Sequence, residues 1–225
     1  GEEAFCGCSS LTQISISSSI ASINRKTFKG CASLVHISIQ SSITEIGESA
    51  FSECLSLRQF SIPSSVNKIG SSSFYSCSSL TQITIPSSVT EIGSSAFRLC
   101  SSLRQITIPS SVTKIGDSTF YGCRSLAQIT NFSSVTEIGN SAFGWCSSLR
   151  QITIPPSLIS IGESVFDGIE SLVVDGNIRK ILDRMFKRCS SLKQITIPSS
   201  VTEIGNSSFN GCSSLTQITI PSSVN

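Results

Sequence analysis

Residues 80–102, LTQITIPSSVTEIGSSAFRLCSS, form one complete unit of a repeat that runs through the whole chain. We number its 23 positions from Leu80, and the same numbers apply to every other unit. Apolar side chains occupy positions 1, 4, 6, 10, 13, 18 and 21, which here are Leu80, Ile83, Ile85, Val89, Ile92, Phe97 and Cys100. Self-similarity at a fixed period of this length is the signature of a solenoid, in which each unit is one turn, or coil.

The spacing of phenylalanine and cysteine carries this period from end to end. Phenylalanine recurs at position 18, as Phe5, Phe28, Phe51, Phe74, Phe97, Phe120, Phe143, Phe166, Phe186 and Phe209. One unit is shorter, because 20 residues separate Phe166 from Phe186. We place the three missing residues in the turn after Phe166, since Leu172 and Ile178 then keep positions 4 and 10.

Each part of the unit indicates a local structure. The pattern LxxIxIP alternates apolar and polar residues, which predicts a strand with one buried face that ends at the proline. VTEIG predicts a second short strand, and we expect its glycine, such as Gly93, to have a positive φ. SSAFxxC predicts one helical or 3₁₀ turn. Stacked units then form a right-handed repeat solenoid, a leucine-rich-repeat coil with a parallel β-sheet.

Composition excludes several classes of function. Charged residues make up 13% of the 225 residues and the net charge is +2, which does not fit a nucleic-acid-binding protein. No apolar stretch is long enough to span a membrane. The single histidine, His36, has no catalytic motif around it, so we expect no enzyme activity and no cofactor.

Nine of the ten cysteines share position 21, from Cys8 to Cys212. No histidines accompany them, so the column does not indicate a metal site. In the short unit Ile169 takes the same position, which indicates that the position requires an apolar side chain. We therefore predict buried, unpaired thiols, with Cys6 at position 19 as an exposed thiol that could react.

The pattern LxxIxIPxxVxxIgxxAFxxCxs resembles the 23-residue, Treponema-type leucine-rich repeat of the BspA-like surface proteins. The resemblance covers the whole chain apart from the short unit. It implies a non-enzymatic array at the cell surface, or secreted, that adheres to host cells or matrix proteins. The alternative is a cytoplasmic scaffold or cytoskeletal structural protein, which the free thiols favour.

Residues 23 apart become neighbours in a stacked solenoid, so equivalent positions form columns on the surface. Positions 3 and 5 point out of the main sheet and position 2 lies beside them. The candidate binding face, for a protein or a glycan, consists of Gln59, Gln82, Gln105, Gln128, Gln151, Thr84, Thr107, Thr153, Arg58, Arg104, Arg150 and His36. The alternative is that the glutamines and threonines form side-chain ladders that only support stacking.

Three further expectations concern single features. Position 12 alternates in charge, which predicts that each side chain faces two opposite charges, in the column Glu45, Lys68, Glu91, Lys114 and Glu137. Asn131 falls at an inward position between Ile108 and Ile154, which predicts a local bulge or a bound water. Residues 1–225 form one leucine-rich-repeat domain of about ten coils, an excerpt without capping repeats that could associate end to end.

Overall fold

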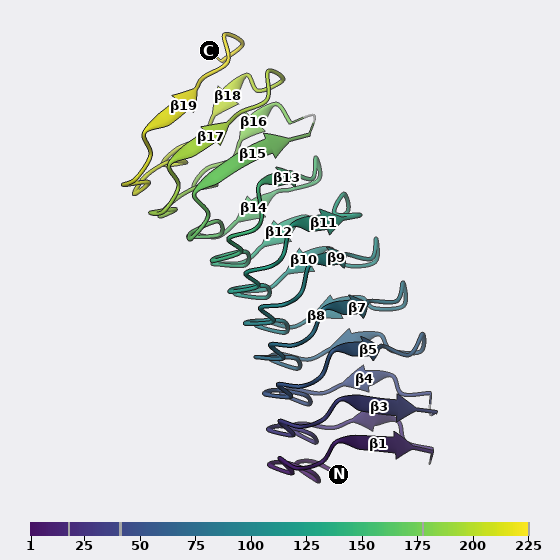
Figure 1. Cartoon of the computed structure of the whole chain (residues 1–225). Coiled ribbons are helices and arrows are strands. Elements are labelled where there is room, and N and C mark those ends of the chain that lie inside the picture. Colours follow the sequence, from purple (N-terminus) through teal and green to yellow (C-terminus); the bar gives the residue numbers. More distant parts are fainter. Residues whose placement is uncertain (18, 41, 177, 225) are drawn as a thin grey trace.

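The computed structural model describes residues 1–17, 19–40, 42–176 and 178–224, and Figure 1 shows them as a parallel β-solenoid. The solenoid predicted from the repeat is confirmed. Each turn contributes a longer strand and a two-residue strand. The longer strands are β1 Gln13–Ile16, β3 His36–Ile39, β5 Gln59–Ser61, β7 Gln82–Thr84, β9 Gln105–Thr107, β11 Gln128–Thr130, β13 Gln151–Thr153, β15 Ser171–Asp175, β17 Gln194–Thr196 and β19 Gln217–Thr219.

The two-residue strands lie at positions 12 and 13, as the VTEIG pattern predicts. They are β2 Ser22–Ile23, β4 Glu45–Ile46, β6 Lys68–Ile69, β8 Glu91–Ile92, β10 Lys114–Ile115, β12 Glu137–Ile138, β14 Ser160–Ile161, β16 Lys180–Ile181 and β18 Glu203–Ile204. All pairings are parallel, and all except that of β13 with β15 match equivalent positions, such as Gln105 with Gln128.

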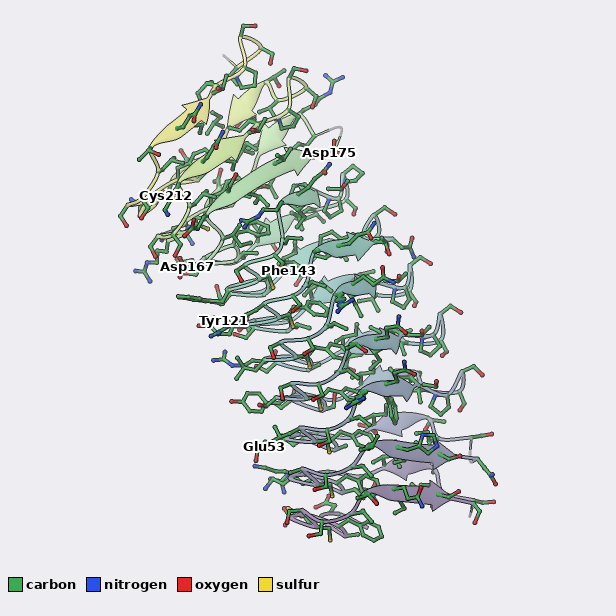
Figure 2. The ribbon with its side chains drawn as sticks, viewed as in Figure 1. Glu53, Tyr121, Phe143, Asp167, Asp175 and Cys212 are labelled. Atoms are coloured by element: carbon green, nitrogen blue, oxygen red, sulfur yellow. The ribbon has the colours of Figure 1, made fainter. Side chains whose placement is uncertain are left out.

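A continuous apolar core fills the inside of the coils, and Figure 2 shows side chains lining it along the whole length. The phenylalanines stack directly over one another. The ring centroids of Phe97 and Phe120 lie 5.6 Å apart with an interplanar angle of 4°. Neighbouring pairs repeat this geometry, which is why the period of phenylalanine equals the length of one coil.

The turn around each phenylalanine differs from the prediction, because no helix or 3₁₀ segment is present in the described residues. Positions 16 and 20 adopt left-handed backbone, with φ of 58° at Ser95 and 63° at Leu99. As a result, alternate amides point along the solenoid axis. Phe97 N–H donates to the Thr119 carbonyl at 2.9 Å and Leu99 N–H to the Tyr121 carbonyl at 2.7 Å, so hydrogen bonds between coils replace those of a helix.

The prediction of positive φ at the position-14 glycines is wrong. The positive-φ glycines lie elsewhere, for example Gly122 at position 20. Position 14 needs glycine because the backbones of adjacent coils meet there. A Cβ atom on Gly70 would lie 2.7 Å from both the backbone nitrogen of Glu48 and the carbonyl carbon of Gly47.

Replacing Gly70 by alanine should therefore force two coils apart. We expect Gly70→Ala to lower the free energy of unfolding by about 3 kcal/mol, since backbone atoms cannot move aside as a side chain can. Gly144→Ala is the matched control, because its Cβ atom would first meet a side chain, the ring of Tyr121, at 2.9 Å. Urea unfolding of both variants measures the difference, and equal losses would contradict this role for position 14.

The cysteine column is buried as predicted, except at the chain ends. Cys31, Cys54, Cys77, Cys100, Cys123, Cys146 and Cys189 are buried, Cys6 and Cys8 are exposed, and all ten cysteines are free. The thiols also have hydrogen-bond partners, which the sequence does not indicate. Cys100 donates from Sγ to the Phe74 carbonyl at 3.1 Å, and Cys123 donates to the Phe97 carbonyl at 3.2 Å.

The solenoid is curved, with its longer strands on the outer side of the arc (Figure 1). Amides of the phenylalanine turns bond from coil to coil throughout the middle of the chain, as between Phe74 N–H and the Ala96 carbonyl at 2.8 Å. By contrast, the ladder of longer strands is interrupted between β3 and β5, β7 and β9, and β11 and β13. The ladder is therefore divided into the pairs β1–β3, β5–β7 and β9–β11 and one block of four strands, β13, β15, β17 and β19.

Asn131 does not point inward. It adopts a left-handed conformation with φ of 56° and is exposed, while Phe132 is buried in its place with its ring edge against Phe143, at a centroid distance of 5.9 Å. Burying an aromatic ring is favourable, whereas burying an amide without a partner is costly, which explains the exchange. The repeat pattern is broken at this point, as the sequence indicates, but the prediction that Asn131 points inward is wrong.

Candidate functional site

The predicted binding face lies on the outer side of the arc, on strands β5 to β13. In β5, β7, β9 and β13 the first and third residues are exposed and the middle residue is buried. Gln59 is in register with Gln82, and Gln105 with Gln128, so the amides form a column. His36 is exposed on β3, which is not bonded to β5, so it lies beside this column rather than within a common ladder.

Two grooves open where β7 and β9 are not bonded to each other. One, of about 370 Å³, is lined by Gln59, Thr81, Gln82, Arg104 and Gln105. The other, of about 200 Å³, adjoins it and is lined by Gln82, Ile83, Thr84, Gln105 and Thr107. The structure thus brings amides, hydroxyls and one guanidinium together at the middle of the face. These groups suit polar contacts with another surface.

Side-chain ladders account for little of this face. Thr107 and Thr130 share a hydrogen bond of 2.8 Å between their hydroxyls. Within the described residues no hydrogen bond joins two of the glutamines, and Gln151 instead donates to a carboxylate oxygen of Asp175 at 3.1 Å. Most of the glutamine amides are therefore available to a partner.

The charged side chains on this face are all basic. Positions 2, 3 and 5 of the coils carrying β5 to β13 include Arg58, Arg104 and Arg150 and no acidic residue. All three arginines are exposed, and none has an ion pair in the part of the chain that the structure describes. The backbone of this column is hydrogen-bonded between coils, as Thr81 N–H donates to the Arg58 carbonyl at 2.9 Å, so the arginine side chains are not needed for stacking.

The charges at position 12 form separate pairs instead of the continuous chain that their alternation predicts. Lys68 Nζ lies 3.5 Å from Glu45, and Lys114 Nζ lies 3.1 Å from Glu137. Glu91 is in register with Lys68 but has no ion pair among the described residues. These exposed pairs contribute little to stability and favour correct register between neighbouring coils.

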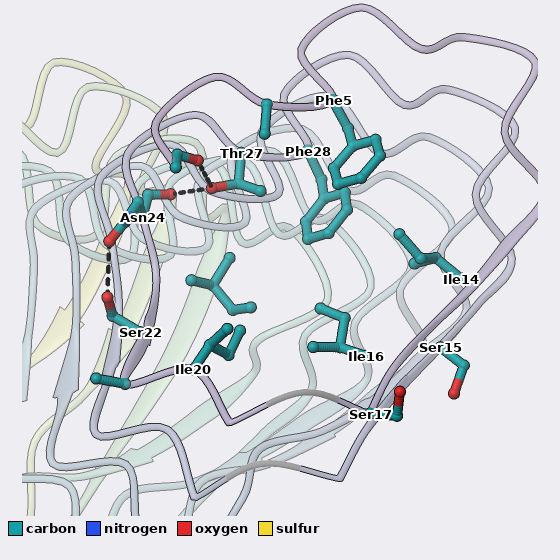
Figure 3. A pocket seen from close by; sticks show the side chains of 14 residues that line it. Phe5, Ile14, Ser15, Ile16, Ser17, Ile20, Ser22, Asn24, Thr27 and Phe28 are labelled. Carbon is teal, nitrogen blue, oxygen red and sulfur yellow. Dashed lines mark hydrogen bonds between the residues drawn. The ribbon is translucent and has the colours of Figure 1, made fainter.

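A further hollow lies at the N-terminal end of the solenoid, and Figure 3 shows the side chains that line it. It has a volume of about 570 Å³, and its lining includes Phe5, Ile14, Ile16, Ile20 and Phe28. These residues continue the core columns, and Phe5 stacks on Phe28 with a centroid distance of 5.3 Å. This hollow thus continues the core columns, and its polar residues Ser22, Asn24 and Thr27 bond to one another.

The described residues contain no group of three or more histidine, cysteine or carboxylate side chains arranged to hold a metal ion. No helix among them is long and apolar enough to cross a membrane. The described residues do present an extended polar surface on the longer strands.

Stacked parallel strands, a buried leucine column and an exposed strand face define a leucine-rich-repeat protein, a class that typically serves as a non-enzymatic scaffold for binding proteins. The chain belongs to the BspA-type leucine-rich-repeat family, because residues 1–127 and 113–225 match the region described as "BspA type Leucine rich repeat region (6 copies)". The family resemblance predicted from the repeat is confirmed.

Solved structures of bacterial leucine-rich-repeat proteins show the same fold. The T. pallidum protein TpLRR is 37% identical over 66% of this chain and 69% of that chain, with a TM-score of 0.62. A Bacteroides ovatus protein is 26% identical over 100% of this chain and 76% of that chain, with a TM-score of 0.67. A leucine-rich cell surface protein from Faecalibacterium prausnitzii is 30% identical over 96% and 61%, with a TM-score of 0.51. No curated protein matches the chain.

Proposed function

We propose that this protein is an adhesion module of the cell surface, and that its outer strand face binds an acidic patch on a host or matrix protein. The observation that carries the proposal is the row of Arg58, Arg104 and Arg150, which make no ion pair among the described residues, and of which Arg104 lines a glutamine groove. Unpaired arginine among amides favours contacts with carboxylates, which guanidinium groups bind in a bidentate geometry. The likeness to a bacterial cell-surface protein supports the location.

Binding of the immobilised chain to cultured epithelial cells and to purified matrix proteins tests this proposal. We expect saturable binding that the triple variant Arg58→Ala, Arg104→Ala, Arg150→Ala weakens roughly tenfold or more, because arginines are frequent hot spots. Its dependence on salt should also become shallower. Arg124→Ala is the matched control, since Arg124 is exposed outside the face. Absence of saturable binding would reject the adhesion function, and binding that the triple variant leaves unchanged would reject this face.

A second function, that of an intracellular scaffold, is favoured by one observation. All ten cysteines are free, which is typical of proteins in reducing compartments. Locating the full-length protein separates the two proposals. Exclusive labelling at the cell surface excludes the scaffold, whereas a filament-bound pool inside the cell excludes adhesion as the main role.

A further inference from the structure

A notch interrupts the column of two-residue strands where the short coil follows its predecessor. No residue of β14 lies within 8 Å, Cα to Cα, of β16, although β14 pairs with β12 and β16 pairs with β18. Figure 1 shows the solenoid changing direction at this point. Two hollows, of about 670 and 320 Å³, adjoin each other here and share Lys180 and Leu182 in their linings.

Leu182 explains the notch. It occupies position 14, where the coils on either side have Gly162 and Gly205. A Cβ atom on Gly162 would lie 2.6 Å from the backbone nitrogen of Asn140, so a leucine in that position cannot rest against the preceding coil. The strand β15 is also displaced by two residues against β13, since Gln151 is in register with Val173 while Val173 is in register with Thr196.

The notch leaves backbone groups of two strand edges without their usual partners. In regular coils the amides at positions 11 and 14 bond to the preceding coil, as Thr202 N–H does to the Arg179 carbonyl at 2.7 Å and Gly205 N–H to the Ile181 carbonyl at 2.8 Å. Within the described residues, Arg179 N–H makes no such bond to the Ile159 carbonyl, and Leu182 N–H makes none to the Ile161 carbonyl. Unpaired strand edges of this kind are where an extended peptide can add by backbone hydrogen bonding.

Apolar side chains surround these backbone groups. Ile159 is 77% exposed and lines the larger hollow together with Ile161 and Leu182. In the coils before β14, isoleucine at position 13 is buried from Ile23 onward, and Ile138 is only 3% exposed. Ile161 and Leu182 are half-buried instead, so the notch offers apolar surface that an incoming side chain could cover.

The rim of the notch is basic. Arg179 and Arg184 are exposed and make no ion pair within the part of the chain that the structure describes. Lys180 is already bonded to Glu203 at 2.6 Å, so it is not free to bind another carboxylate. One acidic residue, Asp183, also lines the larger hollow, but Lys180 lies 4.0 Å from it. The two arginines therefore favour an acidic ligand.

We propose that this notch binds an extended peptide segment of a partner protein in which acidic and apolar residues alternate. Its backbone pairs with the open edge of β14 or β16, its apolar side chains cover Ile161 and Leu182, and its carboxylates reach Arg179 and Arg184. The site is separate from the outer strand face, so its test does not depend on the function proposed above.

A fluorescently labelled hexapeptide, acetyl-Glu-Ile-Glu-Ile-Glu-Ile-amide, is the probe, and anisotropy titration against the whole chain measures its affinity. The comparison peptide has the same composition in blocks, acetyl-Glu-Glu-Glu-Ile-Ile-Ile-amide. We expect the alternating peptide to bind at least tenfold more tightly, since only alternation places apolar and acidic side chains on opposite faces of a strand.

Variants of the chain locate the binding. Arg179→Ala with Arg184→Ala should weaken it roughly tenfold, and Leu182→Gly should do the same by allowing the coils to close. Arg124→Ala is the control, and a circular dichroism melt of every variant checks that it is folded. Equal affinity for the two peptides overturns the proposal. So does binding that survives both the double arginine variant and Leu182→Gly, because the peptide would then be bound at an open end of the solenoid.

Discussion

Phe97→Ala should lower the free energy of unfolding by about 4–5 kcal/mol, near the upper end for loss of a buried aromatic ring. The ring is fully buried and stacks on both neighbours, with centroid distances of 5.4 Å to Phe74 and 5.6 Å to Phe120. Its removal leaves a cavity in a column that the turn hydrogen bonds prevent from collapsing. The coils on both sides of Phe97 should also lose stability, because each coil of a solenoid is stabilised by its neighbours.

Equilibrium unfolding in urea, followed by circular dichroism, measures this loss. Trp145→Ala is the matched control, since it removes a larger aromatic ring that is 45% exposed on the turn edge. We expect the control to lose about 1 kcal/mol or less. A change in the slope of the transition would show that the array has divided into two cooperative units at the altered coil. Comparable losses for both variants would refute the importance of the stacked column.

Features that follow from burial alone could be predicted from the sequence. Leu103, Phe97 and Cys100 recur at one spacing, and each must enter the same core, which fixes the strands, the columns and the family. The position-14 glycines were also recognised as special, although for the wrong reason. Because glycine has no Cβ, it suits a positive φ and a close backbone contact equally well. The repeat alone does not distinguish between these two reasons.

Features that depend on contacts between coils could not be predicted. Left-handed backbone at Ser95 has no signature in residue type, because it is imposed by hydrogen bonds to the next coil. At position 20, where Leu99 lies, glycines such as Gly122 do carry a signal that the sequence analysis did not use. The grooves of the candidate face depend on where the ladder of longer strands is interrupted, and nothing in β7 or β9 distinguishes them from their neighbours by sequence. Leu182 is the exception, since a leucine in a column of glycines is a visible signal for the notch.

The buried thiols make a second large effect predictable, a loss of stability in alkaline solution. Burial raises the pKa of Cys77, Cys100, Cys123 and Cys146 well above the ordinary thiol value of 9.0. Below that value both the folded and the unfolded chain keep these protons, so the full stability is present. Above it the unfolded chain releases protons that the folded chain retains, and the free energy of unfolding therefore falls as the pH rises. Each such thiol contributes about 1.4 kcal/mol per pH unit, so four together contribute about 5–6.

We therefore expect the urea midpoint to decrease steeply between about pH 9 and pH 11 and the chain to unfold there without urea, because a typical domain has only 5–15 kcal/mol to lose. Replacing the four central cysteines by alanine should lower stability at pH 7, yet make its decline with pH markedly shallower. Replacing the exposed Cys6 and Cys8 should leave the steepness unchanged. The deciding quantity is the slope of the unfolding free energy against pH, and not its value at one pH. Lysine ion pairs contribute equally to this slope in the unaltered chain and in both cysteine variants. If the two sets of variants decline equally steeply, the cysteine column does not control alkaline unfolding.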